Sequence, residues 1–278
     1  MKIKTSAKLN LNLAIKSSGF SSLHRIESLI VPIGLYDEIN IDRNSKETDS
    51  ILFKKELELS NNSTIHKALA CLRNNTDLDN FFDIRINKKI PIEAGLGGGS
   101  SDAAAVMVCI SKICDLQLPA FSTITKEVGS DVPFFINGTS ALVKNIGDEI
   151  EDYEIAHDIF FLIIVPTFGL STKAVFNLWD TVQNEDTAMD SFPLTRDITI
   201  FNQALELAIM IKPEIKSLKD SIEKLLDKKV FMTGTGSTLF SIFDSEEEAT
   251  DAKSKINIDN RLILVTKKID YSYKELSD

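Results

Sequence analysis

The chain has few of the residues that mark disulfide-bonded or zinc-binding proteins. Its 278 residues include only three cysteines, Cys71, Cys109 and Cys114, and no two of them form a Cys-x-x-Cys pair. An odd number of cysteines at these spacings argues against a disulfide framework and against a structural zinc site. Cys109 and Cys114 lie in an apolar stretch, so we expect them to be small buried side chains.

The sequence also lacks an excess of positive charge. It has 31 lysines and arginines against 41 acidic residues, a formal net charge of -10, and no basic cluster. A long acidic chain is a poor partner for nucleic acid or for an anionic membrane. We therefore expect small-molecule partners, and any anionic substrate must be held by a local positive field.

Long hydrophobic runs are absent as well. The longest run covers residues 159–165 and ends at Pro166, which is far too short to cross a bilayer. The first residues lack the apolar core of a signal peptide. These features lead us to expect a cytoplasmic protein, present as a monomer or a weak homodimer.

What the chain does have is enough apolar material, 43% of its residues, for a substantial core. Apolar residues occupy every second position from Ile3 to Ile15, which predicts a strand with Lys8, Asn10 and Asn12 on the face opposite the leucines. The rest of the chain mixes helical and strand periods. We predict strands over 28–33, 37–42, 82–86, 140–143, 160–165, 230–232, 238–243 and 262–266, and helices over 63–72, 102–110, 122–128, 200–210, 215–226 and 245–256.

The irregular segments suggest how the chain is divided. The triplet 34–36 is expected to separate two strands, and 129–133 to be a turn with a proline just past a helix end. Ser171 or Thr172 would cap a further helix, and the polar segment 184–196 is the best candidate for a mobile loop. Polar and acidic residues over 151–157 predict a boundary between domains 1–153 and 154–278.

One segment carries clear chemistry. Four of the five positions 95–99 are glycine, and a predicted strand precedes this loop while an alanine-rich helix follows it. Glycines allow the backbone to approach a ligand closely, and the free N–H groups of a helix start attract phosphate. A flexible linker is the alternative, but linkers are not usually flanked so directly by a strand and an apolar helix. The loop matches neither the Walker A pattern nor a dinucleotide fingerprint.

The segment Pro91-x-x-x-Gly95-Leu96-Gly97-Gly98-Gly99-Ser100-Ser101-Asp102 resembles the phosphate-binding motif of the GHMP kinases. Residues 7–11, 129–135 and 232–237 resemble further motifs of the same family, in the same order along the chain. The resemblance implies an α+β fold of two domains, the first like domain 2 of ribosomal protein S5 and the second ferredoxin-like. It also implies ATP as co-substrate and Mg²⁺ as its companion ion. The implied ATP-binding residues are Pro91, Ile92, Glu93, Ala94, Gly95, Leu96, Gly97, Gly98, Gly99, Ser100 and Ser101.

The same resemblance implies two catalytic residues, Lys8 and Asp131. Phosphoryl transfer needs an aligned hydroxyl, a carboxylate to accept its proton, and nearby positive charge. From the residues alone, a lysine on a strand and an aspartate after a glycine are more often surface groups. We find no carboxylate cluster that indicates a metal site, and the hydroxyls of Ser100 or Ser101 are the nearest candidates for a contact with magnesium.

The branch of the family with these motifs acts on a cytidine diphosphate-linked polyol in isoprenoid precursor synthesis, phosphorylating its 2-hydroxyl. The resemblance implies substrate contacts from Asn10, His24 and Phe176, and from the loop of Gly234, Thr235 and Gly236. Phe176 would stack on the cytosine. The family has a tyrosine where this chain has Leu23, and often has paired asparagines near the adenine where this chain has Asn62-Ser63.

Several alternatives remain at this point. His24 can be an ordinary loop or strand histidine, and 234–237 an ordinary hairpin turn. Another GHMP kinase substrate, such as homoserine, mevalonate or a sugar, is compatible with the fold. A catalytically inactive sensor is a further possibility, although the chain keeps both Lys8 and Asp131. A protein-binding module has no positive feature in the sequence.

Overall fold

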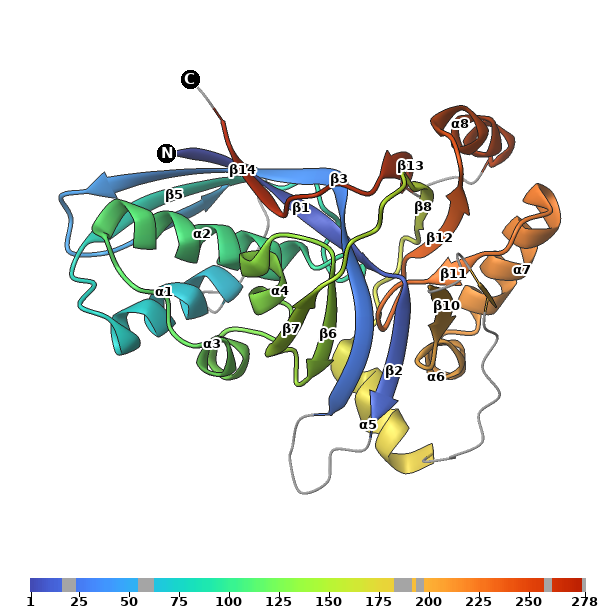
Figure 1. Ribbon diagram of the computed structural model, residues 1–278, viewed down its shortest axis with the longest axis horizontal. Coiled ribbons are helices and arrows are strands. Elements are labelled where there is room, and N and C mark those ends of the chain that lie inside the picture. Colours follow the sequence, from blue (N-terminus) through green and yellow to red (C-terminus); the bar gives the residue numbers. More distant parts are fainter. Residues whose placement is uncertain (17–23, 55–62, 183–191, 194–197, 258–261, 277–278) are drawn as a thin grey trace.

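The computed structural model describes residues 1–16, 24–54, 63–182, 192–193, 198–257 and 262–276 (Figure 1). Its larger sheet runs in the order β14-β1-β3-β2-β10-β9, and β4, β5, β6 and β7 pair outside this path. Its strands are β1 (Lys2–Asn10), β2 (Asn12–Lys16), β3 (Arg25–Asn44), β4 (Ser50–Phe53), β5 (Phe81–Asn87), β6 (Ala141–Asn145), β7 (Glu149–Asp152), β9 (Phe192–Pro193), β10 (Thr199–Asn202) and β14 (Tyr273–Glu275). The alternation from Ile3 to Ile15 is confirmed as β1 and β2.

One predicted break is wrong. Residues 28–33 and 37–42 belong to the single strand β3, and 34–36 do not separate them. In the pairing with β1, Ser6 lies opposite Tyr36 but Ala7 opposite Ile33, so the register shifts there. Gly34 therefore marks a β-bulge, which bends a strand without ending it.

Four helices of the first half cover one face of this sheet. They are α1 (Thr64–Asn75), α2 (Gly98–Cys114), α3 (Phe121–Glu127) and α4 (Val132–Asn137). Figure 1 shows α1 and α2 side by side below β1, β3 and β5. α2 is buried over Ser101–Ser111, as its alanine-rich sequence predicts. The prediction of a mere turn over 129–133 missed α4, because Pro133 stands near a helix start, where its missing N–H costs nothing.

The second half builds a four-stranded antiparallel sheet in the order β11-β12-β8-β13. Its strands are β8 (Phe160–Val165), β11 (Phe231–Met232), β12 (Leu239–Phe243) and β13 (Leu262–Lys267), and its helices are α5 (Thr172–Val182), α6 (Leu205–Ile211), α7 (Glu214–Leu226) and α8 (Glu246–Lys255). The predicted helix over 200–210 is half wrong, since its first residues form β10 and pair in parallel with β2. Of the expected mobile loop 184–196, all but 192–193 lies outside the described residues.

A shared core joins the two halves. The apolar side chains of β1 and β3, among them Leu9 and Val31, pack against Phe161 and Ile163 of β8 and against Phe240 of β12. Strands also cross over, because β10 pairs with β2 and β14 with β1. Three short strands of the second half, β9, β10 and β14, thus belong to the larger sheet. The division into two domains near residue 153 therefore stays a proposal. Within the described residues, no helix is long and apolar enough to cross a membrane.

Candidate active site

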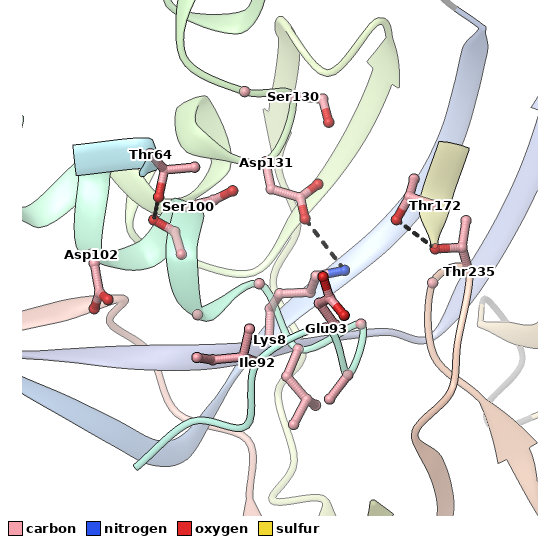
Figure 2. Close-up of a pocket in the computed structure, with 18 of the residues that line it drawn as sticks. Lys8, Thr64, Ile92, Glu93, Ser100, Asp102, Ser130, Asp131, Thr172 and Thr235 are labelled. Carbon is pink, nitrogen blue, oxygen red and sulfur yellow. Dashed lines mark hydrogen bonds and ion pairs between the residues drawn. The ribbon is translucent and has the colours of Figure 1, made fainter. Parts of the chain in front are cut away.

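A cavity of about 560 Å³ lies where the two halves meet. This volume is within the range of roughly 300–1,000 Å³ that ligand pockets occupy. The glycine-rich loop from Pro91 to Ser100 forms much of its wall (Figure 2). Other lining residues come from separate parts of the chain and include Lys8, Asn10, Thr64, Lys88, Asp102, Asp131, Thr172, Phe176, Gly234 and Thr235.

The glycine loop connects the end of β5 to the first turn of α2. Gly95 and Gly97 both adopt the left-handed backbone region, with φ of 76° and 72°. A Cβ at Gly97 would lie 2.8 Å from the ring of Phe135 and 3.0 Å from Cγ of Lys8. The backbone N–H of Lys8 also donates to the Leu96 carbonyl, at 3.1 Å. The loop is thus held close to β1. The first residues of α2 line the cavity, and the free N–H groups of a helix start can bind phosphate.

A second glycine loop meets the first one. A Cβ at Gly95 would come within 2.7 Å of the Gly236 carbonyl oxygen, so the two backbones touch. The N–H of Thr238 donates to the carbonyl of Ala94 at 3.3 Å. Gly234 lies over the polar face of β1, where an added Cβ would be 3.4 Å from Lys8 Nζ. Loop 233–237 is therefore more than a hairpin turn, because it closes the cavity from the second half.

Lys8 and Asp131 are brought together across 123 positions of sequence. Lys8 Nζ lies 3.5 Å from Asp131 Oδ2 (Figure 2), and it also donates to Asn10 Oδ1 at 2.5 Å. Asn10 is held in turn, since its Nδ2 donates to Ser28 Oγ at 2.7 Å and its backbone N–H to Thr233 Oγ1 at 2.8 Å. Lys8 is almost fully buried, whereas the Asp131 side chain is 29% exposed and reaches the cavity. A buried ammonium beside a reachable carboxylate can serve acid–base chemistry on a bound hydroxyl.

A second charged cluster lies at the base of the loop, and the sequence prediction missed it. Lys88 Nζ donates to Asp37 Oδ2 at 2.5 Å and to Asp102 Oδ2 at 2.7 Å, and all three side chains are nearly fully buried. The other oxygen of Asp37 accepts the backbone N–H groups of Lys89 and Ile90. The cluster therefore fixes both the end of β5 and the first turn of α2. In the sequence near the loop, the only feature that hinted at this cluster was the pair of lysines, Lys88 and Lys89, shortly before Pro91.

The protonation of this cluster follows from its burial. Burial raises the pKa of the Asp102 carboxyl to about 7; the Lys88 ammonium opposes the shift and the nearby Asp37 adds to it. For Lys88, burial acts to lower the pKa, but the Asp102 and Asp37 carboxylates outweigh it and the pKa is raised. One ammonium thus serves two buried carboxyls, and burial favours the protonated form of the Asp102 carboxyl.

The two serines at the loop end differ in what they can bind. Ser101 does not line the cavity; its hydroxyl donates to the Ser6 carbonyl at 2.6 Å and contacts Thr5 Oγ1, which ties α2 to β1. Ser100 lines the cavity and is free to contact a ligand or its metal ion. Across the described ranges, no group of three or more His, Cys, Asp or Glu side chains could hold a metal ion.

The far end of the cavity is formed by α5 and the second glycine loop. Thr172, in the first turn of α5, shares a hydrogen bond of 3.0 Å with Thr235 (Figure 2). Ser171 precedes the helix, and its hydroxyl accepts the N–H of Ala174 at 3.4 Å, as a capping residue does. Phe176 follows one turn later and lines the cavity.

Two of the predicted substrate residues do not line the cavity. Gly236 lies behind Thr235, against the first glycine loop, and His24 stacks on Phe176 with ring centroids 4.7 Å apart. Leu23 and Asn62 lie outside the described residues, whereas Ser63 lines the cavity beside Thr64. Sequence reasoning also missed Thr64, whose hydroxyl donates to the Gly99 carbonyl at 2.8 Å.

Two protein-family models match this chain, and both describe kinases. The family model for the N-terminal domain of GHMP kinases matches residues 63–139, and the model for their C-terminal domain matches residues 191–261. Together these two ranges cover more than half of the chain. The chain belongs to the GHMP kinase family, and it is a small-molecule kinase with ATP as co-substrate.

Among individual relatives, two enzymes share one named kinase activity. The 4-diphosphocytidyl-2-C-methyl-D-erythritol kinase of Colwellia psychrerythraea is 31% identical, with 90% of this chain and 84% of the relative aligned. The enzyme of the same name from Clostridium tetani is 29% identical over 97% of this chain and 100% of its own length.

Solved structures show the same fold. A 4-(cytidine 5'-diphospho)-2C-methyl-D-erythritol kinase superposes with a TM-score of 0.76 at 22% identity, covering 96% of this chain and 99% of that one. A homoserine kinase from Cytophaga hutchinsonii superposes with a TM-score of 0.67 at 14% identity, covering 99% and 96%. The predicted α+β fold of two GHMP kinase domains is confirmed.

Proposed function

We propose that this chain transfers the γ-phosphate of ATP to the 2-hydroxyl of 4-diphosphocytidyl-2-C-methyl-D-erythritol, a step in the non-mevalonate route to isoprenoid precursors. The observation that carries this proposal is a single cavity lined by the Lys8–Asp131 pair, by the glycine loop and by Phe176. The two kinase relatives described above bear that activity in their names.

At the nucleotide end, the backbone of the glycine loop and the first turn of α2 bind the ATP phosphates. The N–H groups at a helix start donate to phosphate oxygens, and the helix dipole favours their negative charge. Such backbone binding suits a chain with a net charge of -10, because it needs no broad basic surface. The Lys88 cluster holds both ends of the loop in place while ATP binds.

At the reacting centre, Asp131 accepts the proton of the substrate hydroxyl as that oxygen bonds to the γ-phosphorus. The bond between the γ-phosphorus and the β–γ bridging oxygen breaks, and ADP leaves with the electron pair. Lys8 offsets negative charge on the transferring group. Asn10 holds the Lys8 ammonium in place through its Oδ1.

Mg²⁺ accompanies ATP in this proposal. Magnesium keeps several water ligands and is usually held by substrate phosphates with one or two protein oxygens. The cavity fits that pattern, since it offers the Ser100 hydroxyl and the Asp131 carboxylate but no dedicated metal cage among the described residues. When bound, the ion would neutralise phosphate charge.

At the substrate end, the second glycine loop and the start of α5 face the diphosphate, and Phe176 offers its ring to the cytosine. Aromatic rings stack on any nucleobase, so this contact supplies affinity. Gly234 and Thr235 border the same space as Asp131. A diphosphate held there leaves the polyol end of the substrate free to reach the Lys8–Asp131 pair.

An ADP-release assay tests the proposal directly. The purified chain is given ATP and Mg²⁺ with the cytidylated substrate, and separately with mevalonate and with homoserine. We expect turnover with the cytidylated substrate alone. Turnover of mevalonate or homoserine alone would refute the substrate assignment, and no ADP release with any acceptor would favour a sensor that binds ATP without using it.

We infer that the enzyme acts in the cytoplasm, where ATP and nucleotide-linked metabolites are found, and that it works as a monomer or weak homodimer. We also keep the division into domains 1–153 and 154–278, with the substrates bound at their junction.

A further inference from the structure

Two tyrosines from distant parts of the chain lie in contact away from the active site. Tyr36 comes from β3 and Tyr271 from the segment between β13 and β14, and their rings are nearly parallel, with an interplanar angle of 9° and centroids 6.2 Å apart. The two phenol oxygens lie 2.9 Å apart and share a hydrogen bond. All four tyrosines of the chain are among the described residues, and only these two form such a pair.

Strand β1 holds the two tyrosines in this arrangement. Ser6 lies opposite Tyr36 in the pairing with β3, and its backbone N–H donates to the Ser272 carbonyl at 2.7 Å. Two positions earlier on β1, Lys4 Nζ lies 4.1 Å from the centroid of the Tyr36 ring and 5.3 Å from that of Tyr271. Both tyrosines are half-buried, so small molecules in solution can reach the exposed parts of their rings.

The surroundings make Tyr271 the more easily oxidised of the two phenols. Burial acts to raise its pKa, but hydrogen bonds from Lys4 and Tyr36 and the charges of Lys4 and Lys274 outweigh burial, and the pKa is lowered. Burial raises the pKa of Tyr36, and the hydrogen bond and charge of Tyr271 add to that shift. Tyr36 therefore keeps its proton and donates it to the Tyr271 oxygen. A phenol with such phenolate character gives up an electron more readily than an ordinary phenol.

We propose that Tyr36 and Tyr271 form an oxidative modification site, at which a one-electron oxidant joins the two rings into a dityrosine. Each phenol loses one electron to the oxidant and its hydroxyl proton to water, and the two phenoxyl radicals combine in a bond between ring carbons ortho to the oxygens. The hydrogens on those carbons leave as protons while the oxygens are protonated again, so the chain loses two hydrogen atoms in total. In a dityrosine the two oxygens lie side by side, and in this pair they already do.

The new bond ties the C-terminal segment of the chain to β3. Its two residues are 235 positions apart in the sequence. A crosslink across so long a stretch restricts the unfolded chain, as a disulfide does, and thereby stabilises the fold. Neither tyrosine lines the active-site cavity, so the modification leaves the groups around the glycine loop unchanged.

Photo-oxidation with tris(bipyridyl)ruthenium and persulfate, a one-electron oxidant, tests the proposal. In the wild-type chain we expect dityrosine fluorescence, a monomer mass lower by two hydrogen atoms, and a peptide that joins residues 36 and 271. Tyr36→Phe and Tyr271→Phe keep both rings but remove one phenol each, and both variants should lose this product. The matched controls Tyr153→Phe and Tyr273→Phe replace half-buried tyrosines outside the pair and should form the product as the wild type does.

Further measurements distinguish this pair from nonspecific oxidation. The yield should not change when the protein is diluted, because both rings belong to one chain, and the crosslinked chain should melt at a higher temperature than the untreated one. Thermal melting before oxidation checks that each variant folds. A crosslink that maps to Tyr153 or Tyr273, or one that joins two chains, would overturn the proposal. So would the absence of dityrosine under conditions in which free tyrosine forms it.

Discussion

The two ends of the cavity are built in different ways. At the end of the cavity proposed to bind ATP, here called the ATP end, ten consecutive residues from Pro91 to Ser100 line the wall, and α2 begins within this stretch. At the end proposed to bind the cytosine, here called the base end, the cluster of His24, Phe176 and Asp180 draws on two segments about 150 residues apart. The ATP end is thus formed by one continuous stretch of backbone, whereas the base end depends on side chains that only the fold brings together.

This difference indicates which end of the cavity could change its ligand specificity through single substitutions. Backbone N–H groups at a helix start bind phosphate whatever the neighbouring side chains are. The ATP end therefore needs glycines and a helix start, and it does not depend on particular side chains. The base end relies on a few side chains from distant segments, which can be exchanged one at a time. The reacting pair lies between them, with Lys8 on β1 and Asp131 just before α4.

The largest expected effect falls on the reacting pair. In Asp131→Asn the carboxylate that accepts the hydroxyl proton is gone, and we expect kcat to fall by about 10²–10⁴. ATP binding, measured by calorimetry, should stay within about threefold, because the glycine loop is untouched. The control Glu149→Gln, on exposed β7, should be fully active. A variant that retains its turnover would mean that another group is the base.

The next effect concerns the support of the glycine loop. Lys88→Met leaves the two buried carboxyl groups of Asp37 and Asp102 without their ammonium, and breaking a buried pair costs about 3–5 kcal/mol. We expect this loss in the free energy of unfolding, measured by urea denaturation. Lys89→Met removes the exposed ion pair with Glu38 and should cost less than about 1 kcal/mol. Similar losses in the two variants would contradict the supporting role of the buried cluster.

At the base end, Phe176→Ala should act on one substrate only. Stacking on an aromatic ring contributes about 1–3 kcal/mol per base, so the KM for the cytidylated substrate should rise at least severalfold. The KM for ATP should not change, and Phe176→Tyr should restore most of the affinity. A parallel rise in both KM values would show that the two ends are not independent.

The smallest effect is a pH dependence of stability. The folded chain holds the Asp102 proton up to about pH 7, whereas an unperturbed aspartate releases it near 3.8. Between these values the folded state binds more protons than the unfolded state, so this group's contribution to the free energy of unfolding falls as pH rises. The difference in stability between Asp102→Asn and the wild type should therefore shift in favour of the variant from pH 4.5 to 7.5.

A control for this pH effect is available on the surface. Asp152 is exposed, and hydrogen bonds from Asn137 and Thr139 lower its pKa. Its contribution is present above the unfolded pKa and is lost only in more acidic solution. Asp152→Asn should therefore give a difference from wild type that is constant between pH 5 and 7.5. If the Asp102→Asn difference is equally flat, the carboxyl of Asp102 is not protonated in the folded chain.

Some parts of this protein could be predicted from local sequence alone. The glycine loop, the buried helix α2 and the alternating β1 follow from short-range periodicity and from the backbone freedom of glycine. The family motifs extended this to Lys8 and Asp131, which the fold places 3.5 Å apart. Two of the errors were local: Gly34 marked a bulge within β3 rather than a break, and Pro133 stands in the first turn of a helix that was not expected.

Other features were decided by the tertiary structure. Nothing near Lys88 in the sequence indicates that it neutralises Asp37, 51 residues earlier, because burial and pairing across strands are properties of the fold. The same holds for His24 and Asp180, 156 residues apart. Short-range patterns determined the phosphate loop because its chemistry belongs to the backbone. The side chains that hold this loop, and those at the base end, could be identified only once packing had brought distant segments into contact.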